Sequence, residues 1–273
     1  MIFCGCSSAS LARDYTRTNC GEGFDLSDLS LTGAQSDLIQ AVYATGKPVI
    51  LVLVSGKPFA ISWEKEHIPA IVAQWYGGEQ EGYAIADVLF GKVNPSGHLT
   101  YSFPQSAGHL PVYYNHLPSD KGFYKRPGSY EQSGRDYVFS SPEPLWAFGH
   151  GLSYTTFSYG DLQLDKTSVQ GENGVLTASV QVTNTGKLEG EEVVQLYIGD
   201  PAASISRPMK ELKNFQKISL KPGESRKVSF TITPEDLKFY NSALEYIWEP
   251  GLFNIYVGTN SRDVKSAQVT WNK

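Results

Sequence analysis

The sequence has few cysteines, no run of basic residues and no long apolar stretch. Its three cysteines, Cys4, Cys6 and Cys20, all lie near the start of a chain of 273 residues, so a disulfide framework cannot span the fold. The net charge is −5 without any basic cluster, which argues against nucleic acid or an anionic membrane surface as a partner. No apolar run approaches the roughly 20 residues of a membrane-spanning helix. We therefore expect a neutral ligand.

Signals for targeting, metals and cofactors are also missing. Met1-Ile2-Phe3 has neither the basic nor the apolar region of a secretory signal, so we expect none in the chain as given, and its compartment stays open. His109 and His116 lie seven positions apart on a proline-containing segment without a carboxylate at ligand spacing, so we expect no metal. No motif points to a cofactor.

The composition is that of an ordinary globular protein. Hydrophobic residues make up 41 % and charged residues 19 % of the chain, which is long enough for two domains. Aromatic residues make up 12 %, including 16 Tyr and 5 Trp, and aromatic faces suit sugars. Aromatic cores are the commoner explanation for such a content.

Helical and strand patterns alternate between residues 31 and 103. Thr32 and Gln35 match a capping box at the start of a helix. Residues 49–54 are six consecutive aliphatics, which is typical of a parallel strand covered on both faces. A second apolar stretch and a helical pattern at 84–90 follow. This order predicts an α/β sheet.

The pattern changes twice in the second half of the chain. From residue 103 to 155 the periodicity is lost in a stretch rich in proline, glycine and aromatics, as in a functional loop or an interdomain connection. Beyond Phe157 apolar and polar residues alternate with period two, between turns such as Asn184-Thr185-Gly186 and Pro222-Gly223. Several short strands of this kind predict an immunoglobulin-like β-sandwich.

Seven short motifs along the chain carry a family resemblance. They are Thr45-Gly46-Lys47-Pro48, Trp75-Tyr76-Gly77-Gly78, the stretch 84–91, Asn94-Pro95-Ser96-Gly97-His98-Leu99, the stretch 110–115, the stretch 148–157 and the stretch 206–212. Each alone is weak, but together and in this order they resemble glycoside hydrolase family 3 over nearly the whole chain. The chain looks like the C-terminal part of a three-domain β-glucosidase.

The resemblance implies three segments. Residues 1–120 are expected to form a partial α/β sandwich domain with a mostly parallel sheet. Residues 121–157 are expected to form an aromatic-rich connecting loop, and residues 158–273 a fibronectin type III-like β-sandwich. The first nine residues resemble a strand from the middle of the family's sandwich domain, so we expect either a fragment of a larger protein or one half of a split gene.

Glu22 is the strongest candidate for a catalytic residue. It lies between Gly21 and Gly23, where the backbone can approach a ligand, although for this stretch taken alone a solvated acidic turn is the commoner explanation. The resemblance implies that Glu22 is the general acid/base, because family members carry it in a Gly-Glu-Gly-x-Asp stretch. Asp25 then either orients Glu22 or caps the next turn.

Retention of configuration also requires a second carboxylate about 5 Å away. In family 3 this nucleophile is an aspartate of an N-terminal (β/α)8 barrel, and these residues contain no such barrel. We therefore expect a β-glucosidase-like hydrolase portion that is inactive as an isolated chain, with a β-linked glucoside or oligosaccharide as substrate and a separate or missing barrel as partner.

Other residues are weaker candidates for sugar binding. Trp75, Trp146 and Tyr137 could stack on a sugar ring, with core packing or loop anchoring as the alternative. Arg13 could reach the pocket mouth, with a local ion pair to Asp14 as the alternative.

Two hypotheses remain besides the one that the chain is part of an enzyme. The chain could be a non-catalytic carbohydrate-binding or interaction protein derived from such an enzyme, or a fragment without an independent role. The sequence does not show whether the sugar is glucose, xylose or N-acetylglucosamine, because the resemblance implies that residues of the barrel mostly determine sugar specificity.

Overall fold

The structure, a computed structural model, describes residues 1–7, 19–21, 25–118 and 140–273. Contacts divide the chain into two compact units. The first consists of Met1–Val93, Ser102–Val112 and Tyr124–Trp146, and the second of Asn94–Tyr101, Tyr113–Phe123 and Ala147–Lys273. The boundaries proposed at residues 120 and 157 remain predictions from the sequence.

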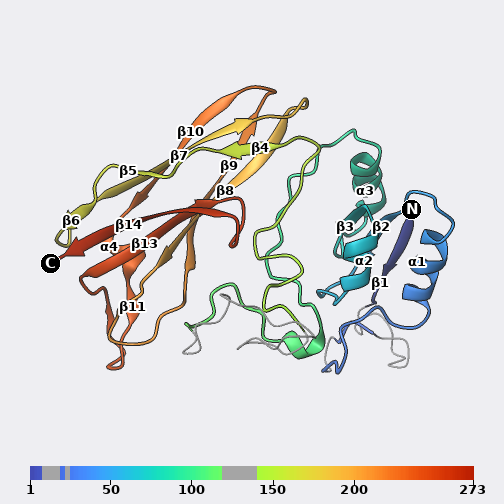
Figure 1. Ribbon diagram of the computed structural model, residues 1–273, viewed down its shortest axis with the longest axis horizontal. Helices are drawn as coiled ribbons and strands as arrows, with labels where there is room; N and C mark the ends of the chain where they lie inside the picture. Colours follow the sequence, from blue (N-terminus) through green and yellow to red (C-terminus); the bar gives the residue numbers. More distant parts are fainter. Residues whose placement is uncertain (8–18, 22–24, 119–139) are drawn as a thin grey trace. The chain divides into compact units, whose positions relative to one another are not determined.

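The first unit is built on a parallel sheet of three strands in the order β1-β2-β3 (Figure 1). The strands are β1 (Ile2–Gly5), β2 (Ile50–Val54) and β3 (Ala70–Ala73), with helices α1 (Gln35–Tyr43), α2 (Ser62–His67) and α3 (Glu81–Leu89) and a short 3-10 turn, η3 (Ala107–His109). The middle strand contains Leu51, Val52 and Leu53, all buried. Burial of both its faces explains the unbroken aliphatic run in the sequence.

The helix α1 does not begin with the predicted capping box. Its N-cap is Ala34, and no side chain of the described residues caps it. The Gln35 side chain instead accepts a hydrogen bond from the Gly5 backbone N–H at 2.7 Å and donates to the Thr32 carbonyl at 2.9 Å. The Thr32 hydroxyl accepts from the Asn19 amide at 2.7 Å. The capping box is therefore wrong, because tertiary partners occupy both of its side chains.

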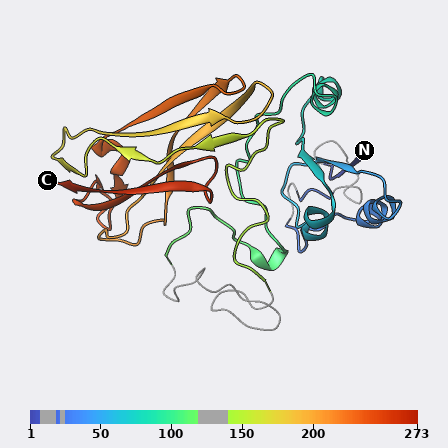
Figure 2. The ribbon, with the colours of Figure 1, turned by 45° about the horizontal axis from the view of Figure 1, so that its top comes forward.

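The second unit is a sandwich of two antiparallel-rich sheets (Figure 2). One sheet has the order β10-β7-β4, with β5 also paired to β7, and the other has the order β6-β14-β13-β8-β9. Their strands are β4 (Phe157–Tyr159), β5 (Gln163–Leu164), β6 (Ser168–Gln170), β7 (Leu176–Asn184), β8 (Gly190–Gly199), β9 (Glu211–Leu220), β10 (Ser225–Ile232), β13 (Gly251–Gly258) and β14 (Val264–Asn272). A short helix, α4 (Pro234–Leu237), and a hairpin of β11 (Phe239–Tyr240) and β12 (Tyr246–Ile247) complete it.

The core of this sandwich follows the predicted alternation. Inward-facing Val180, Leu196, Phe230 and Ile255 come from four different strands and join one buried cluster. Each buried side chain of this size contributes roughly 1.5–3 kcal/mol relative to an exposed one. The predicted fold class, an α/β piece followed by an immunoglobulin-like or fibronectin III-like β-sandwich, is confirmed.

Part of the segment without periodicity is ordered by hydrogen bonds to residues outside it. In the second unit, the Leu99 N–H donates to the His150 carbonyl at 2.8 Å and the Gly149 N–H donates to the Leu99 carbonyl at 2.7 Å. The buried Gln195 side chain of β8 donates to the carbonyls of Gly149 and Thr259, at 3.1 and 2.6 Å. A stretch without strand periodicity is thus fixed by backbone hydrogen bonds and by a side chain of β8. Among the helices that the structure describes, none is both long enough and apolar enough to span a membrane.

Candidate functional site

The carboxyl ends of the three parallel strands meet at one edge of the first unit's sheet. The Cys6 N–H, just after β1, donates to the Val54 carbonyl at the end of β2 at 3.0 Å. The Gln74 N–H, just after β3, donates to the Leu53 carbonyl at 3.0 Å. Ligands of open α/β sheets bind outside this edge, so the residues that follow the strands form the candidate site.

The end of β1 requires glycine. Gly5 has φ of +153°, and a Cβ built there would lie 1.8 Å from the Val54 carbonyl oxygen. A side chain at this position would force the two strands apart. The Gly5 N–H also donates to Gln35, so the first residue of α1 is tied to the same point.

Asn19 anchors the segment that leads to Glu22. Its side-chain oxygen accepts from the Ser7 N–H at 2.8 Å, and its amide nitrogen donates to the Thr32 hydroxyl at 2.7 Å. Gly21 follows with φ of +84°, a conformation that favours glycine. The chain therefore enters the predicted Gly-Glu-Gly stretch from the carboxyl edge of the sheet. Glu22 itself lies outside the described residues, as do Arg13 and Tyr137.

Trp75 is placed at this edge in a strained backbone conformation. It follows β3 with φ of +59°, which is a genuine outlier for a bulky residue. Such a conformation costs on the order of 1–2 kcal/mol, and strain of this kind clusters at functional sites. The Trp75 ring lies 6.3 Å from the Phe103 ring, which in turn meets Trp146 edge to face at 5.4 Å. Packing on Phe103 and Lys65 accounts for Trp146, whose ring the Lys65 ammonium approaches at 5.5 Å.

A polar cluster at the same edge was not predicted from the sequence. The Tyr76 hydroxyl donates to the Cys6 carbonyl at 2.9 Å, and the Cys6 sulfur lies 3.0 Å from the Ser55 hydroxyl. The Ser55 hydroxyl donates to the Lys57 carbonyl at 2.8 Å. A Cβ at Gly56 would lie 2.8 Å from the Tyr76 ring, so glycine there admits the ring. In the sequence, the features that could have indicated this cluster were Ser55-Gly56 after the aliphatic run and Tyr76 beside Trp75.

Burial changes the charge behaviour of this cluster. Tyr76 is 47 % exposed, but partial desolvation, assisted by Cys6, raises the pKa of its phenol above its usual value, so the side chain acts as a neutral donor. Desolvation also lowers the pKa of the Lys57 ammonium. Its Nζ is buried without a hydrogen-bond partner among the described residues and lies 4.7 Å from the centre of the Phe59 ring. The edge therefore presents polar groups in a partly desolvated setting.

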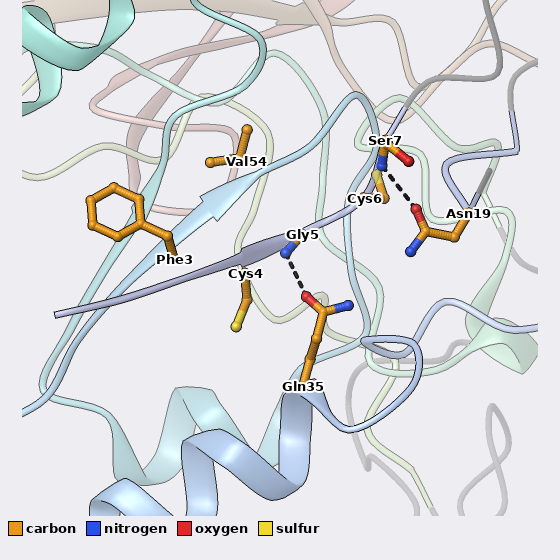
Figure 3. A pocket seen from close by; sticks show the side chains of 8 residues that line it. All are labelled: Phe3, Cys4, Gly5, Cys6, Ser7, Asn19, Gln35 and Val54. Carbon is orange, nitrogen blue, oxygen red and sulfur yellow. Dashed lines mark hydrogen bonds between the residues drawn. The ribbon is translucent and has the colours of Figure 1, made fainter. Parts of the chain in front are cut away.

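An open hollow of about 370 Å³ adjoins the end of β1. Figure 3 shows its lining, which comprises Phe3, Cys4, Gly5, Cys6, Ser7, Asn19, Gln35 and Val54. Its volume falls in the range of small-molecule pockets, roughly 300–1,000 Å³. Part of it is the uncovered side of the edge strand β1, where Phe3 is exposed.

His109, one of the two histidines considered for metal binding, has structural partners on both ring nitrogens. The His109 Nε2 donates to the Pro142 carbonyl at 2.9 Å, and its Nδ1 accepts from the Gln105 N–H at 3.2 Å. Across the described part of the chain, no group of three or more metal-binding side chains occurs.

Models of known protein families match residues in both units. The family model described as "Glycosyl hydrolase family 3 C-terminal domain" matches residues 5–154, and that described as "Fibronectin type III-like domain" matches residues 192–261. A beta-xylosidase of Formosa agariphila is 48 % identical over 254 residues, which cover 92 % of this chain and 34 % of the relative. A periplasmic beta-glucosidase of Salmonella typhimurium is 47 % identical over 245 residues, with 89 % and 32 % covered.

A comparison with solved structures also finds a beta-glucosidase. The crystal structure of a beta-glucosidase from Listeria innocua in complex with glucose matches with a TM-score of 0.86 at 38 % identity, covering 93 % of this chain and 35 % of that chain. The chain spans about a third of the length of the curated relatives it matches, in their C-terminal part. Because one family model matches more than half of its residues and relatives are close to half identical along most of its length, this chain belongs to glycosyl hydrolase family 3.

Proposed function

We propose that this chain supplies the general acid/base, Glu22, of a retaining β-glycosidase acting on terminal β-D-glucosyl or related residues. The nucleophile comes from a (β/α)8 barrel outside these 273 residues. The isolated chain then binds sugar weakly and hydrolyses nothing, because one carboxylate alone cannot complete the retaining reaction.

The observation that carries this proposal is the family match through residues 5–154, which includes Glu22 in its Gly-Glu-Gly setting. The relatives named above are a beta-xylosidase and a beta-glucosidase, and the matched crystal structure holds glucose. The described flanks of Glu22 support the placement, since Asn19 and Gly21 bring the chain to the carboxyl edge of the sheet.

The chemistry assigned to Glu22 has two halves. In the first, its protonated carboxyl donates to the glycosidic oxygen while the barrel carboxylate attacks the anomeric carbon and forms a glycosyl-enzyme. In the second, the Glu22 carboxylate takes a proton from the water that releases the sugar. Trp75 is assigned a stacking contact with the sugar, which accounts for its strained backbone at the same sheet edge.

Complementation with a family-type barrel that carries its aspartate tests the proposal. The combined protein should hydrolyse an aryl β-glucoside, and Glu22→Gln should lower turnover by roughly 10²–10⁴-fold, the usual contribution of general acid/base catalysis. Azide should rescue the Glu22→Gln variant by attacking the glycosyl-enzyme without general base help, giving a β-glycosyl azide. Glu79→Gln, an exposed carboxylate after Gly77-Gly78, is the matched control and should leave turnover unchanged.

Absence of activity in the combined protein with a cognate barrel would contradict the proposal. Hydrolysis by the chain alone, abolished in Glu22→Gln, would contradict the need for a barrel. If the chain alone binds glucose or cellobiose saturably at millimolar or better affinity and no barrel restores turnover, the non-catalytic carbohydrate-binding function replaces the enzyme portion.

A further inference from the structure

The three cysteines of the first unit lie in two different environments. Cys4 is buried, and burial raises the pKa of its thiol, so it is the less reactive sulfur. Cys6 and Cys20 are only partly buried and lie at the carboxyl edge of the sheet. All three are described, and none forms a disulfide in this structure.

The chain segments that carry Cys6 and Cys20 are joined by a hydrogen bond next to both cysteines. The Ser7 N–H donates to the Asn19 side chain at 2.8 Å, so each cysteine is the immediate neighbour of one partner in this hydrogen bond. Figure 3 shows Cys6, Ser7 and Asn19 grouped at the end of β1. A disulfide needs Cα atoms about 4.4–6.8 Å apart, which fits two adjacent segments.

Both thiols also interact with the same two side chains. The Cys6 sulfur lies 3.5 Å from the Tyr76 hydroxyl, and both Cys6 and Cys20 interact electrostatically with Tyr76 and with Lys57. The Lys57 ammonium is buried, and within the described residues no hydrogen bond satisfies it. The thiolate, which carries a negative charge, is the species that reacts in thiol–disulfide exchange.

We propose that Cys6 and Cys20 form a reversible disulfide, with a small-molecule disulfide such as oxidised glutathione as the oxidant. One of the two thiolates attacks the oxidant, forms a mixed disulfide and releases one glutathione thiolate. The second cysteine then attacks the protein sulfur of the mixed disulfide and releases the other glutathione thiolate. The two protons lost by the cysteines are taken up by the two released thiolates, so two thiols and one disulfide become one disulfide and two thiols.

The bridge has a consequence for the proposed site, and this consequence alone rests on the proposed function. Cys20 lies two residues before Glu22, and the bridge ties it covalently to the end of β1. A cross-link reduces the conformational freedom of the segment it closes. Oxidised and reduced chains are therefore expected to differ at least twofold in barrel-complemented turnover.

Mass spectrometry of the full chain tests the bridge without any activity. Cys4 and Cys6 lie on one tryptic peptide, so a Cys4→Ala variant leaves only the proposed pair. After incubation with oxidised glutathione and quenching with N-ethylmaleimide, the peptide of Cys6 should be linked to that of Cys20, and dithiothreitol should separate them. Should Cys4→Ala not fold, fragmentation of the linked wild-type peptides between Cys4 and Cys6 gives the same answer.

Single variants sharpen this test. Cys20→Ser should leave Cys6 as a stable glutathione adduct, and Cys6→Ser should leave Cys20 in that state. Lys57→Gln should slow formation of the bridge roughly threefold or more, because it removes the ammonium that interacts with both sulfurs. Lys47→Gln, an exposed lysine before β2, should not change the rate.

Separate glutathione adducts on Cys6 and Cys20 without a bridge, or a bridge that involves Cys4, would overturn the pairing. A bridge that forms without changing barrel-complemented turnover would overturn only its consequence for Glu22. Absence of turnover in the reduced, combined protein would count against the proposed function and leave the bridge standing.

Discussion

The two units of this chain differ in how their apolar cores are built. In the second unit a single cluster of buried residues joins both sheets of the sandwich. In the first unit the core lies around a parallel sheet of three described strands, whose middle strand is mostly buried while Phe3 of the edge strand β1 is 54 % exposed. Large apolar side chains are exposed in both units, among them Phe90 after α3 and Phe215 of β9, at 77 % and 60 %. The proposed catalytic and thiol chemistry belongs to the first unit.

The difference follows from strand pairing. An antiparallel sandwich encloses its core with its own strands, and the period-two pattern beyond Phe157 supplies both inner faces. A parallel sheet needs cover on both faces and at its edges, and β1 is an edge strand within the three described strands. The same kind of substitution should therefore change the free energy of unfolding by different amounts in the two units.

The largest contrast is expected between two phenylalanines. Phe253 in β13 is 1 % exposed, so Phe253→Ala should lower the free energy of unfolding of the second unit by about 3–5 kcal/mol. Phe3→Ala in the open edge strand should change the stability of the first unit by no more than about 0.5 kcal/mol. Urea unfolding followed by tryptophan fluorescence and hydrogen exchange measures both. Equal effects would show that Phe3 is covered in solution, which would remove the contrast.

The next largest effect tests the junction of β1 with β2. Gly5→Ala places a Cβ against the Val54 carbonyl oxygen and should destabilise the first unit by roughly 2–4 kcal/mol. Hydrogen exchange should speed up in β1 and β2 and stay unchanged in β7 and β8. Gly46→Ala is the matched control, since Gly46 has a positive φ but nothing within 4 Å of its Cβ position. Destabilisation no greater than that of Gly46→Ala would mean that β1 moves away freely.

A buried carboxylate in each unit gives a finer comparison. In the second unit the Tyr159 hydroxyl donates to Glu192 at 2.6 Å, and in the first the Ser36 hydroxyl donates to Glu64 at 3.2 Å. Tyr159→Phe should cost about 1–3 kcal/mol, because it removes a donor from a buried acceptor. Ser36→Ala should cost less, because its bond is longer. Thermal unfolding of each variant against wild type measures the two values, and a larger loss for Ser36→Ala would reverse the comparison.

The sequence predicted the fold where local patterns dominate. The aliphatic run of β2 and the alternation of β7 and β8 report burial directly, so both fold classes were predictable. The capping box failed because Thr32 and Gln35 are occupied by Asn19 and Gly5, partners that local pattern cannot reveal.

The site was predictable only through its motifs. Glu22 follows from the resemblance and stays a prediction, since it lies outside the described residues. Cys6 and Tyr76 are seventy positions apart in sequence and meet only because β1 and β3 flank the same strand. The positive φ of Trp75 is a backbone property that residue type argues against.

The smallest expected effect concerns backbone strain, and it tests whether strain at the candidate site has a role that strain in a surface loop lacks. Each unit has one described non-glycine residue at positive φ, Trp75 at +59° and Leu244 at +62°. Leu244 lies in the loop between β11 and β12 and is 81 % exposed, so Leu244→Gly should stabilise the second unit by up to about 0.5 kcal/mol after the entropy cost of glycine. Trp75→Gly relieves the same backbone strain, yet it should weaken binding of glucose to the combined protein, as isothermal titration would measure. If Trp75→Gly leaves binding intact, its strain serves only packing on Phe103, and the two units do not differ in this respect.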